Sequence, residues 1–271
     1  MKRPLEADDS HRYNRGDVFV LKECVTGDGL DHLLANLDTA MVPEERVKFS
    51  SYASDMLWGG NCRIVAYSKV AHGWGRLYAD GALSMQGFSK PVRSVLAGKL
   101  YHDIDIENCH PVILLDLCKR EGWEAPILEA YVNDREFILA DTSLPRGDAK
   151  VAMLTIMYGG NPKHNFPMAT VFKREMSRIA DLIWNEYPLV PVSQPRNARF
   201  SRMSLLIQDL ECRLLMEIAA FFRKHGYRIG VYVFDGLMIY RKATDGPLDS
   251  HLLRACERVL SIPVVLAEKT L

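Results

Sequence analysis

Two apolar segments separated by one Asp-Gly pair constrain the fold of this chain most strongly. Residues 227–234 read YRIGVYVF and residues 237–241 read LMIYR, with Asp235 and Gly236 between them. Asp-Gly between two apolar runs is a strong β-hairpin signal, so an antiparallel strand pair is expected here. Because both runs are almost continuously apolar, the hairpin is predicted to be central and to carry a carboxylate at its tip.

Helical segments dominate the rest of the chain and are mixed with strands. Helices are expected at residues 28–58, 89–98, 111–121, 125–139, 142–158, 169–186, 201–225 and 248–260. Further strands are expected within 61–84, at 101–106 and at 263–268. This mixture, with an antiparallel hairpin, indicates an α+β fold rather than a repeated βαβ unit.

Composition excludes several classes of protein. The 271 residues are 48% hydrophobic and 25% charged, which indicates a packed core and argues against disorder. No run of about 18 apolar residues occurs, and the polar N-terminus has no apolar signal core, so no membrane partner is expected. The six cysteines include no Cys-x-x-Cys pair; Cys118 and Cys212 lie in apolar runs and are expected in the core. A reducing, cytoplasmic location is therefore predicted.

The net charge is zero, which argues against a protein that coats nucleic acid non-specifically. A local bias nevertheless exists between residues 63 and 99, where Asp80 is the single acidic residue. The basic residues there are Arg63, Lys69, Arg76, Lys90, Arg93 and Lys99. A solvated face and a groove for nucleic acid are both open interpretations of this bias.

The segment YHDIDIENCHP, residues 101–111, carries the first candidate site. Asp103 and Asp105 lie on one face of the predicted strand because side chains alternate. A rigid strand that ends in a carboxylate can hold a metal ion, although such a pair on an edge strand is more often simply solvated. Pro111 suits the first turn of the helix that follows.

Asp235 is the second candidate, and on its own an Asp-Gly pair is more often just a turn. Two-metal nucleotidyl transfer requires carboxylates from separate segments to converge, because the two ions lie roughly 3.5–4 Å apart. Asp105 and Asp235 would form such a pair.

The helix predicted within RGDAKVAMLTIMYGG, residues 146–160, carries the third candidate. Arg146, Lys150, Leu154 and Tyr158 are spaced four apart and so form one slowly drifting stripe. Two cations one turn apart suit a triphosphate, and an aromatic ring two turns beyond the second cation suits a base. An ordinary exposed basic face is the alternative.

The pattern of Arg146, Lys150, Tyr158 and Gly159 resembles motif B of the family A DNA polymerases and of the single-subunit phage-type RNA polymerases. Four more segments resemble other blocks of that superfamily and follow in the same order. These are residues 73–96, residues 100–114 as motif A, residues 201–219 and residues 231–239 as motif C. The chain departs from the family at Phe234, where His is usual, and at Gly236, where the DNA polymerases usually have Glu.

The resemblance implies a right-hand polymerase architecture: a palm with an antiparallel sheet, helical fingers, little or no thumb and no exonuclease domain. The expected domains are residues 1–60 as a reduced, thumb-like helical region, 61–115 as the first part of the palm, 116–200 as the fingers, and 201–271 as the second part of the palm.

The same resemblance implies the roles of individual residues. Asp105, Asp235 and the backbone of Ile106 would hold two Mg²⁺ ions, for which oxygen ligands are suitable. Arg146 and Lys150 would act on the triphosphate, with Tyr158, His110 and Leu154 beside the nucleotide. Asp103 would be a supporting or structural residue. Contacts with the primer–template would come from Arg76, Gln86, Arg93 and Gln208.

The predicted function is template-directed synthesis by a DNA-directed DNA polymerase that uses nucleoside triphosphates, with a possible processivity or helicase partner and a phage, viral or plasmid-type origin. DNA synthesis is preferred because a rigid His110 would crowd a 2′-hydroxyl. A DNA-directed RNA polymerase or primase is the alternative, since Leu154 is aliphatic as in the RNA-making relatives. A nucleic-acid-binding module of the same fold without catalysis is the second alternative.

Overall fold

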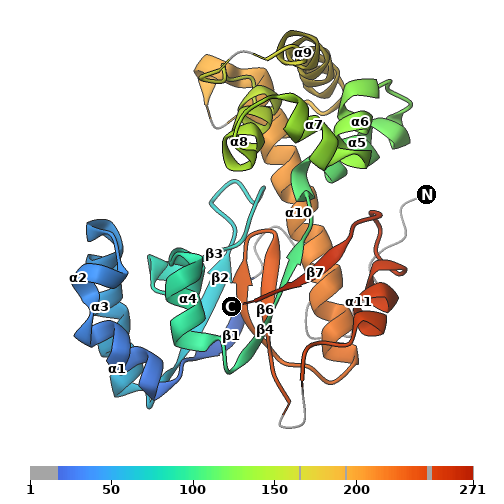
Figure 1. The fold of residues 1–271 in the computed structure, drawn as a ribbon. Coiled ribbons are helices and arrows are strands. Elements are labelled where there is room, and N and C mark those ends of the chain that lie inside the picture. The colour runs from blue at the N-terminus through green and yellow to red at the C-terminus, as the bar shows by residue number, and fades with distance from the viewer. Residues whose placement is uncertain (1–17, 165, 193, 243–245, 271) are drawn as a thin grey trace. The chain divides into compact units, whose positions relative to one another are not determined.

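The computed structural model describes residues 18–164, 166–192, 194–242 and 246–270. The chain divides into two compact units, whose elements are labelled in Figure 1. The strand unit comprises Met1–Glu107 and Cys212–Leu271, and the helical unit comprises Asn108–Glu211. The strand unit is thus built from two separate stretches of chain, and the helical unit is inserted between them.

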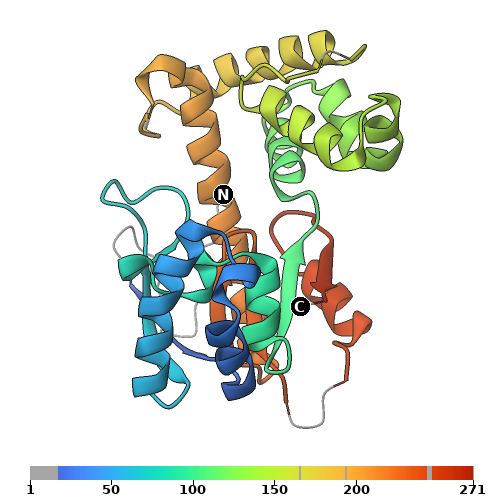
Figure 2. The same cartoon turned by 60° about the vertical axis from the view of Figure 1, so that its left-hand side comes forward.

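The first sheet of the strand unit is antiparallel and has the order β1-β2-β3. Its strands are β1 (Phe19–Cys24), β2 (Cys62–Ser68) and β3 (Tyr78–Ala79). Between β1 and β2 the chain forms α1 (Gly27–Ala35), α2 (Leu37–Ala40) and α3 (Pro43–Trp58). Figures 1 and 2 both show these helices gathered beside α4 (Lys90–Ala97). Two short 3₁₀ turns, Asp80–Ala82 and Met85–Gly87, precede α4.

The second sheet carries the candidate carboxylates. Its order is β5-β6-β4-β7, and every neighbouring pair is antiparallel. The strands are β4 (Tyr101–Ile106), β5 (Ile229–Val233), β6 (Gly236–Tyr240) and β7 (Leu266–Lys269), with α11 (Ser250–Glu257) before β7. The predicted hairpin is confirmed as β5 and β6. Its second strand is internal, but β5 forms an edge of this sheet, so only half of the hairpin is central.

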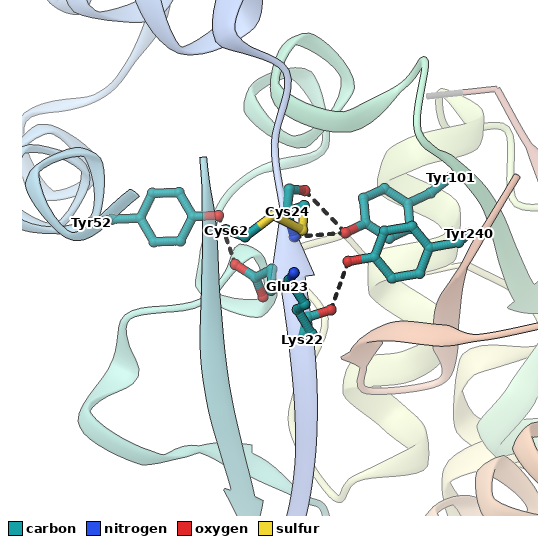
Figure 3. Close-up of a disulfide and its surroundings, with 7 residues drawn as sticks. All are labelled: Lys22, Glu23, Cys24, Tyr52, Cys62, Tyr101 and Tyr240. Carbon is teal, nitrogen blue, oxygen red and sulfur yellow. Dashed lines mark hydrogen bonds between the residues drawn. A yellow bond between two sulfur atoms is a disulfide. The ribbon is translucent and has the colours of Figure 1, made fainter. Parts of the chain in front are cut away.

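A disulfide joins Cys24 and Cys62, which face each other at the end of the β1–β2 pair (Figure 3). A Cys-x-x-Cys pattern does not reveal this pair, because the two cysteines are 38 residues apart in the chain. The disulfide argues against the reducing location that the sequence predicted. The Tyr101 hydroxyl accepts from the Cys24 amide at 2.8 Å, and the Tyr240 hydroxyl donates to the Lys22 carbonyl at 2.7 Å. These two tyrosines connect the second sheet to β1. Cys118 and Cys212 are buried, as predicted.

The helical unit contains α5 (Cys109–Glu121), α6 (Pro126–Asn133), α7 (Arg135–Asp141), α8 (Arg146–Met157), α9 (Ala169–Glu186) and the first part of α10 (Ala198–Lys224), which follows a 3₁₀ turn at Pro195–Asn197. A buried carboxylate organises its core. Glu175 of α9 accepts hydrogen bonds from the amides of Ile127 and Leu128 at 3.0 and 2.8 Å. It thereby caps the start of α6, whose first amides have no partner within the helix.

Several predicted boundaries differ from the structure for local reasons. The helix expected at 125–139 is two helices that separate at Asp134. The helix expected from residue 142 begins at Arg146, because Pro145 disfavours helical geometry in the residue before it and Thr142 bonds the Leu144 amide instead. The helix expected from Pro111 begins two residues earlier, at Cys109.

Strand β1 was not predicted. Its alternation is obscured by Glu23, which points inward and is fully buried. The Glu23 carboxylate accepts hydrogen bonds from the Tyr52 and Ser84 hydroxyls and from the Met85 amide. A charged residue facing the core cannot be recognised from pattern alone.

Residues 1–17 lie outside the described residues, so the expectation for the first part of region 1–60 has no structural counterpart. Within the part of the chain that the structure describes, no helix has both the length and the apolar character needed to cross a bilayer.

Candidate active site

Three carboxylates meet at one cavity of about 160 Å³ in the strand unit. Asp103 and Asp105 come from β4, and Asp235 comes from the turn between β5 and β6. Strands β4 and β6 are paired with Asp105 opposite Gly236. This register places Asp235, the residue before Gly236, next to Asp105. The complete lining is Lys90, Arg93, Asp103, Asp105, Val233, Asp235, Gly236 and Lys269. The structure therefore brings together the two aspartates that the sequence proposed as a pair.

The hairpin turn places Asp235 through an unusual backbone. Val233 pairs with Gly236, so the central residues of the turn are Phe234 and Asp235 rather than Asp235 and Gly236. Phe234 has a φ of 50°, a conformation that large side chains rarely adopt. The Ile106 amide donates to the Asp235 carbonyl at 3.1 Å and ties the turn to the end of β4. Strain of this kind persists only where the surrounding structure holds it.

Gly236 explains one departure from the family pattern. A Cβ atom at this position would lie 2.5 Å from the Ile104 carbonyl oxygen and 3.4 Å from the Asp105 Cα atom. Both atoms belong to the backbone of β4 and cannot move aside without separating the strands. A glutamate therefore has no room where the DNA polymerases of the family usually have one.

Burial and the neighbouring carboxylates raise the pKa of two of these aspartates, Asp103 and Asp105. Burial, and next the charge of Asp235, raise the pKa of Asp105 to about 6, although Lys269 opposes the shift. Burial also raises the pKa of Asp103, against Arg93 and Lys90. The Lys269 ammonium lies 3.4 Å from the Asp105 carboxylate. Its charge lowers the pKa of Asp105, but by less than burial and the charge of Asp235 raise it.

Sequence reasoning missed Lys269 and Lys90 as site residues. Lys269 faces Asp103 across the β4–β7 pair, a neighbour relation that only the sheet order creates. Lys90 could have been noticed, because it stands three residues before Arg93 on the predicted helix and so shares its face.

The cavity suits a divalent cation in the chemistry of its donors. Asp105 and Asp235 supply hard carboxylate oxygens. The pKa of Asp105 is raised first by burial and next by the charge of Asp235, and a bound cation would offset both effects. No cluster of three or more His, Cys, Asp or Glu side chains placed to hold a metal occurs among the described residues. A metal here would therefore also need backbone, water or substrate oxygens, and the role of Ile106 stays a prediction.

The structure corrects one proposed contact with nucleic acid. Gln86 is buried, and its amide nitrogen donates to the carbonyls of Leu77 and Tyr232, both at 3.0 Å. Its amide oxygen accepts from the Ala79 amide at 3.0 Å. The side chain is committed to joining three segments of the strand unit and has no free face for a ligand.

Arg76 and Arg93 have other surroundings. The Arg76 guanidinium lies over the Phe234 ring, 5.0 Å from its centroid. Arg93 donates to the Phe88 carbonyl at 2.7 Å and lines the cavity. Both are half-buried, so they contribute charge beside the hairpin tip rather than on an open face.

The predicted stripe lies on α8 in the helical unit, and the opposite face of that helix is buried. Lys150 is exposed, and Leu154 and Tyr158 are half-buried. Arg146 is exposed and pairs with Glu136 through two hydrogen bonds of 2.7 and 2.6 Å. That pair raises the pKa of Arg146 and lowers that of Glu136. Lys150 is thus the more open of the two cations.

His110 contacts two partners within the helical unit. Its Nε2 atom bonds the Glu211 carboxylate, and its Nδ1 atom bonds the Tyr158 hydroxyl. Tyr158 and His110 were both predicted beside the nucleotide, but their contact with each other and the participation of Glu211 were not. Gln208 is half-buried and donates to the Ser204 hydroxyl at 3.0 Å.

No protein-family model matches the sequence. In an alignment of 204 positions that covers 68% of the chain, it is 31% identical to the protein named "Putative helicase V13" of Sputnik virophage. The chain covers 26% of that relative, about a quarter of its length.

The structure is similar to the POL domain of Pol1 from M. smegmatis, solved with DNA primer–template and dNTP. The TM-score is 0.58 and the identity 14%, over 88% of this chain and 52% of that one. At this identity the likeness concerns the fold: the chain has a polymerase-like fold of helices and antiparallel sheets.

Proposed function

We propose that this chain is a nucleotidyltransferase that carries out template-directed DNA synthesis. The observation that carries the proposal is the meeting of Asp105 and Asp235 at one cavity, delivered by paired strands of a polymerase-like fold. The resemblance of five ordered sequence blocks to the family A superfamily supports the finer assignment. On that assignment residues 61–115 and 201–271 form a palm, residues 116–200 form fingers, and the 1–60 region is a reduced thumb.

The residues of the cavity would organise the reacting phosphates. Asp105, Asp235 and the Ile106 carbonyl would hold two Mg²⁺ ions, which when bound supply Lewis-acid stabilisation of the attacking and leaving oxygens. Lys90, Arg93 and Lys269 add positive charge around the same cavity. Such fixed charge stabilises the negative charge that develops on phosphate oxygens during transfer.

The helical unit would hold the incoming nucleotide. Lys150 is open to bind the triphosphate, and Arg146 would exchange Glu136 for a phosphate, since a guanidinium binds either anion in the same forked geometry. Tyr158 would stack on or beside the nascent pair, with His110 and Leu154 against the sugar. Arg76, Arg93 and Gln208 would contact the primer–template backbone or minor groove, largely without regard to sequence.

The solved neighbour was determined with DNA primer–template and dNTP, which supports these ligand classes for the present chain. The virophage relative supports a viral-type origin. Its name includes helicase, but the single Gly-Lys pair of this chain, Gly98-Lys99, is followed by Leu100 and does not fit the phosphate-binding P-loop pattern. We therefore assign helicase activity to a linked domain or a separate partner protein, and not to this segment.

An RNA polymerase or primase is the second candidate function, favoured by aliphatic Leu154 and by the capacity of His110 for hydrogen bonding. DNA synthesis is preferred because His110 is held from both sides, by Glu211 and Tyr158, and a fixed ring excludes a 2′-hydroxyl better than a mobile one.

Primer extension with labelled dNTPs and NTPs, on DNA and RNA templates, tests the proposal. Asp105→Asn and Asp235→Asn should each lower extension by on the order of 100-fold or more while circular dichroism stays unchanged. Asp31→Asn, an exposed carboxylate on α1, is the matched control and should extend as the wild type does. Near-wild-type extension by either cavity variant would exclude the two-metal assignment. Absence of any extension by the wild type would favour the binding module.

A further inference from the structure

Three side chains from separate helices form a connected chain inside the helical unit. Glu211 comes from α10, His110 from the first turn of α5, and Tyr158 from the end of α8. Glu211 bonds His110 across 101 residues of sequence, and His110 bonds Tyr158 across 48 residues. We call these three residues the relay.

Two side chains of the relay, Glu211 and His110, are largely or fully buried. The Glu211 side chain is 0% exposed and the His110 side chain 15% exposed. A buried carboxylate is costly unless it is hydrogen-bonded and paired, so the Glu211–His110 contact stabilises a group that would otherwise disfavour folding.

The proton positions follow from the chemistry of the donors when Glu211 is ionised and His110 is neutral. An ionised glutamate only accepts hydrogen bonds, so the Nε2 atom of His110 must carry a proton. In a neutral imidazole the Nδ1 atom is then an acceptor, and the Tyr158 hydroxyl donates to it. Glu211 therefore selects one tautomer of His110 and, through it, one orientation of the Tyr158 hydroxyl.

The backbone holds Tyr158 at the other end of the relay. Tyr158 is the C-terminal cap residue of α8. Its backbone carbonyl accepts a hydrogen bond from the side-chain amide of Asn197 at 3.3 Å. Gly159 then turns the chain with a φ of 78°, and a Cβ atom there would lie 2.4 Å from the Phe200 ring. The His110 and Tyr158 rings are almost perpendicular, at 86°, with centroids 5.8 Å apart. The two rings thus form a fixed corner.

We infer that Glu211 is a positioning residue for sugar selection: it holds His110 and Tyr158 as a rigid corner that excludes the ribose 2′-hydroxyl. The inference rests on the proposed function, in which His110 and Tyr158 lie beside the nucleotide. Glu211 itself touches no substrate in this scheme and acts through His110.

Glu211→Gln is the informative variant. Glutamine keeps the size of glutamate but can donate as well as accept, so it no longer dictates the tautomer of His110. The ratio of kcat/KM for dNTP to that for NTP should fall roughly fivefold or more, as expected from weakening one buried hydrogen bond. His110→Ala should lower the same ratio roughly tenfold, because it removes the crowding ring. The matched control is Glu175→Gln, which removes another buried carboxylate of the helical unit that caps α6 and should leave the ratio unchanged.

A second measurement separates this inference from the proposed function. Histidine ¹⁵N NMR of the full chain should show one His110 tautomer, protonated at Nε2, in the wild type and in Glu175→Gln, and a mixture in Glu211→Gln. A released tautomer with an unchanged sugar ratio would overturn the positioning role and leave the polymerase assignment standing. A ratio that falls equally in Glu175→Gln would reduce Glu211 to a structural residue. A wild type that extends no primer would overturn the proposed function and with it the sugar role, while the NMR result would still report the Glu211–His110 bond.

Discussion

Asp105 is a residue whose ionised form opposes folding. Its pKa is raised to about 6 from an ordinary value of 3.8, so the folded state binds its proton more tightly than the unfolded state. Ionisation between about pH 4 and pH 6 therefore lowers the free energy of unfolding as the pH rises.

Asp105→Asn should consequently stabilise the metal-free protein at pH 7.5, by on the order of 1 kcal/mol once solvent screening of this partly exposed side chain is allowed for. The advantage should disappear below about pH 4, where the wild-type carboxyl is protonated in both states. Urea unfolding in EDTA from pH 4 to pH 8 measures this, with Asp31→Asn as the neutral control. Lower stability of Asp105→Asn at pH 7.5 would contradict the proposed source of the shift.

Gly236 is a second residue of the cavity whose identity matters, because the β4 backbone leaves no space for a side chain there. Gly236→Ala should lower the free energy of unfolding by about 1–3 kcal/mol, the usual range for overpacking, because the added methyl group meets the β4 backbone. Primer extension should fall with it. Gly147→Ala, at an open position on α8, is the stability control and should be neutral or slightly stabilising. An unchanged melting temperature for Gly236→Ala would show that β4 and β6 are less tightly paired than the register indicates.

At the scale of elements, the nucleotide contact proposed for α8 lies on its exposed face. Lys150→Ala should raise the KM for nucleotide by roughly tenfold, since it removes one charged contact to phosphate, and should leave duplex affinity almost unchanged. Steady-state kinetics and gel-shift titration measure the two effects separately. Lys173→Ala, an exposed lysine on α9, serves as the control. Loss of duplex binding with an unchanged nucleotide KM would mean that this helix contacts nucleic acid instead.

Strand β1 is an element that depends on partners elsewhere in the chain. Its disulfide to β2 closes a loop across a separation of 38 residues, for which chain entropy gives a stabilisation of about 3–4 kcal/mol. The double variant Cys24→Ser, Cys62→Ser should lose stability of this order in chemical denaturation. Reductant should destabilise the wild type and have no effect on the variant. Labelling of six thiols in the unfolded, unreduced protein, rather than four, would show that the disulfide is absent.

At the scale of the whole molecule, the helical unit is an insertion whose ends meet. The chain enters the unit at Asn108 and leaves it at Glu211, and His110 bonds Glu211. A unit with adjacent ends and its own buried core can fold alone. Residues 108–211 expressed as a fragment should therefore unfold cooperatively, with an enthalpy of about 60–80 kcal/mol near its midpoint. Calorimetry and far-UV circular dichroism provide the measurement; a broad, non-cooperative transition would refute independent folding.

Local pattern in the sequence was sufficient for most elements of the fold. Strand β4, helices α4, α9 and α10 and the β5–β6 hairpin were predictable because periodicity, caps and turn residues act over a few positions. The pairing of Asp105 with Asp235 was also predictable from sequence, because two-metal chemistry requires carboxylates from separate segments to converge. Their roles as metal ligands remain a prediction.

Tertiary structure alone decided what surrounds those residues. The order β5-β6-β4-β7 places Lys269 beside Asp105, although 164 positions separate them in the numbering (269 − 105). Folding also turned Gln86 inward and set Glu211 against His110. The physical reason is the same in each case: a side chain's partner, burial and pKa depend on chain segments far away in sequence, and a pattern read along the sequence reports only its neighbours.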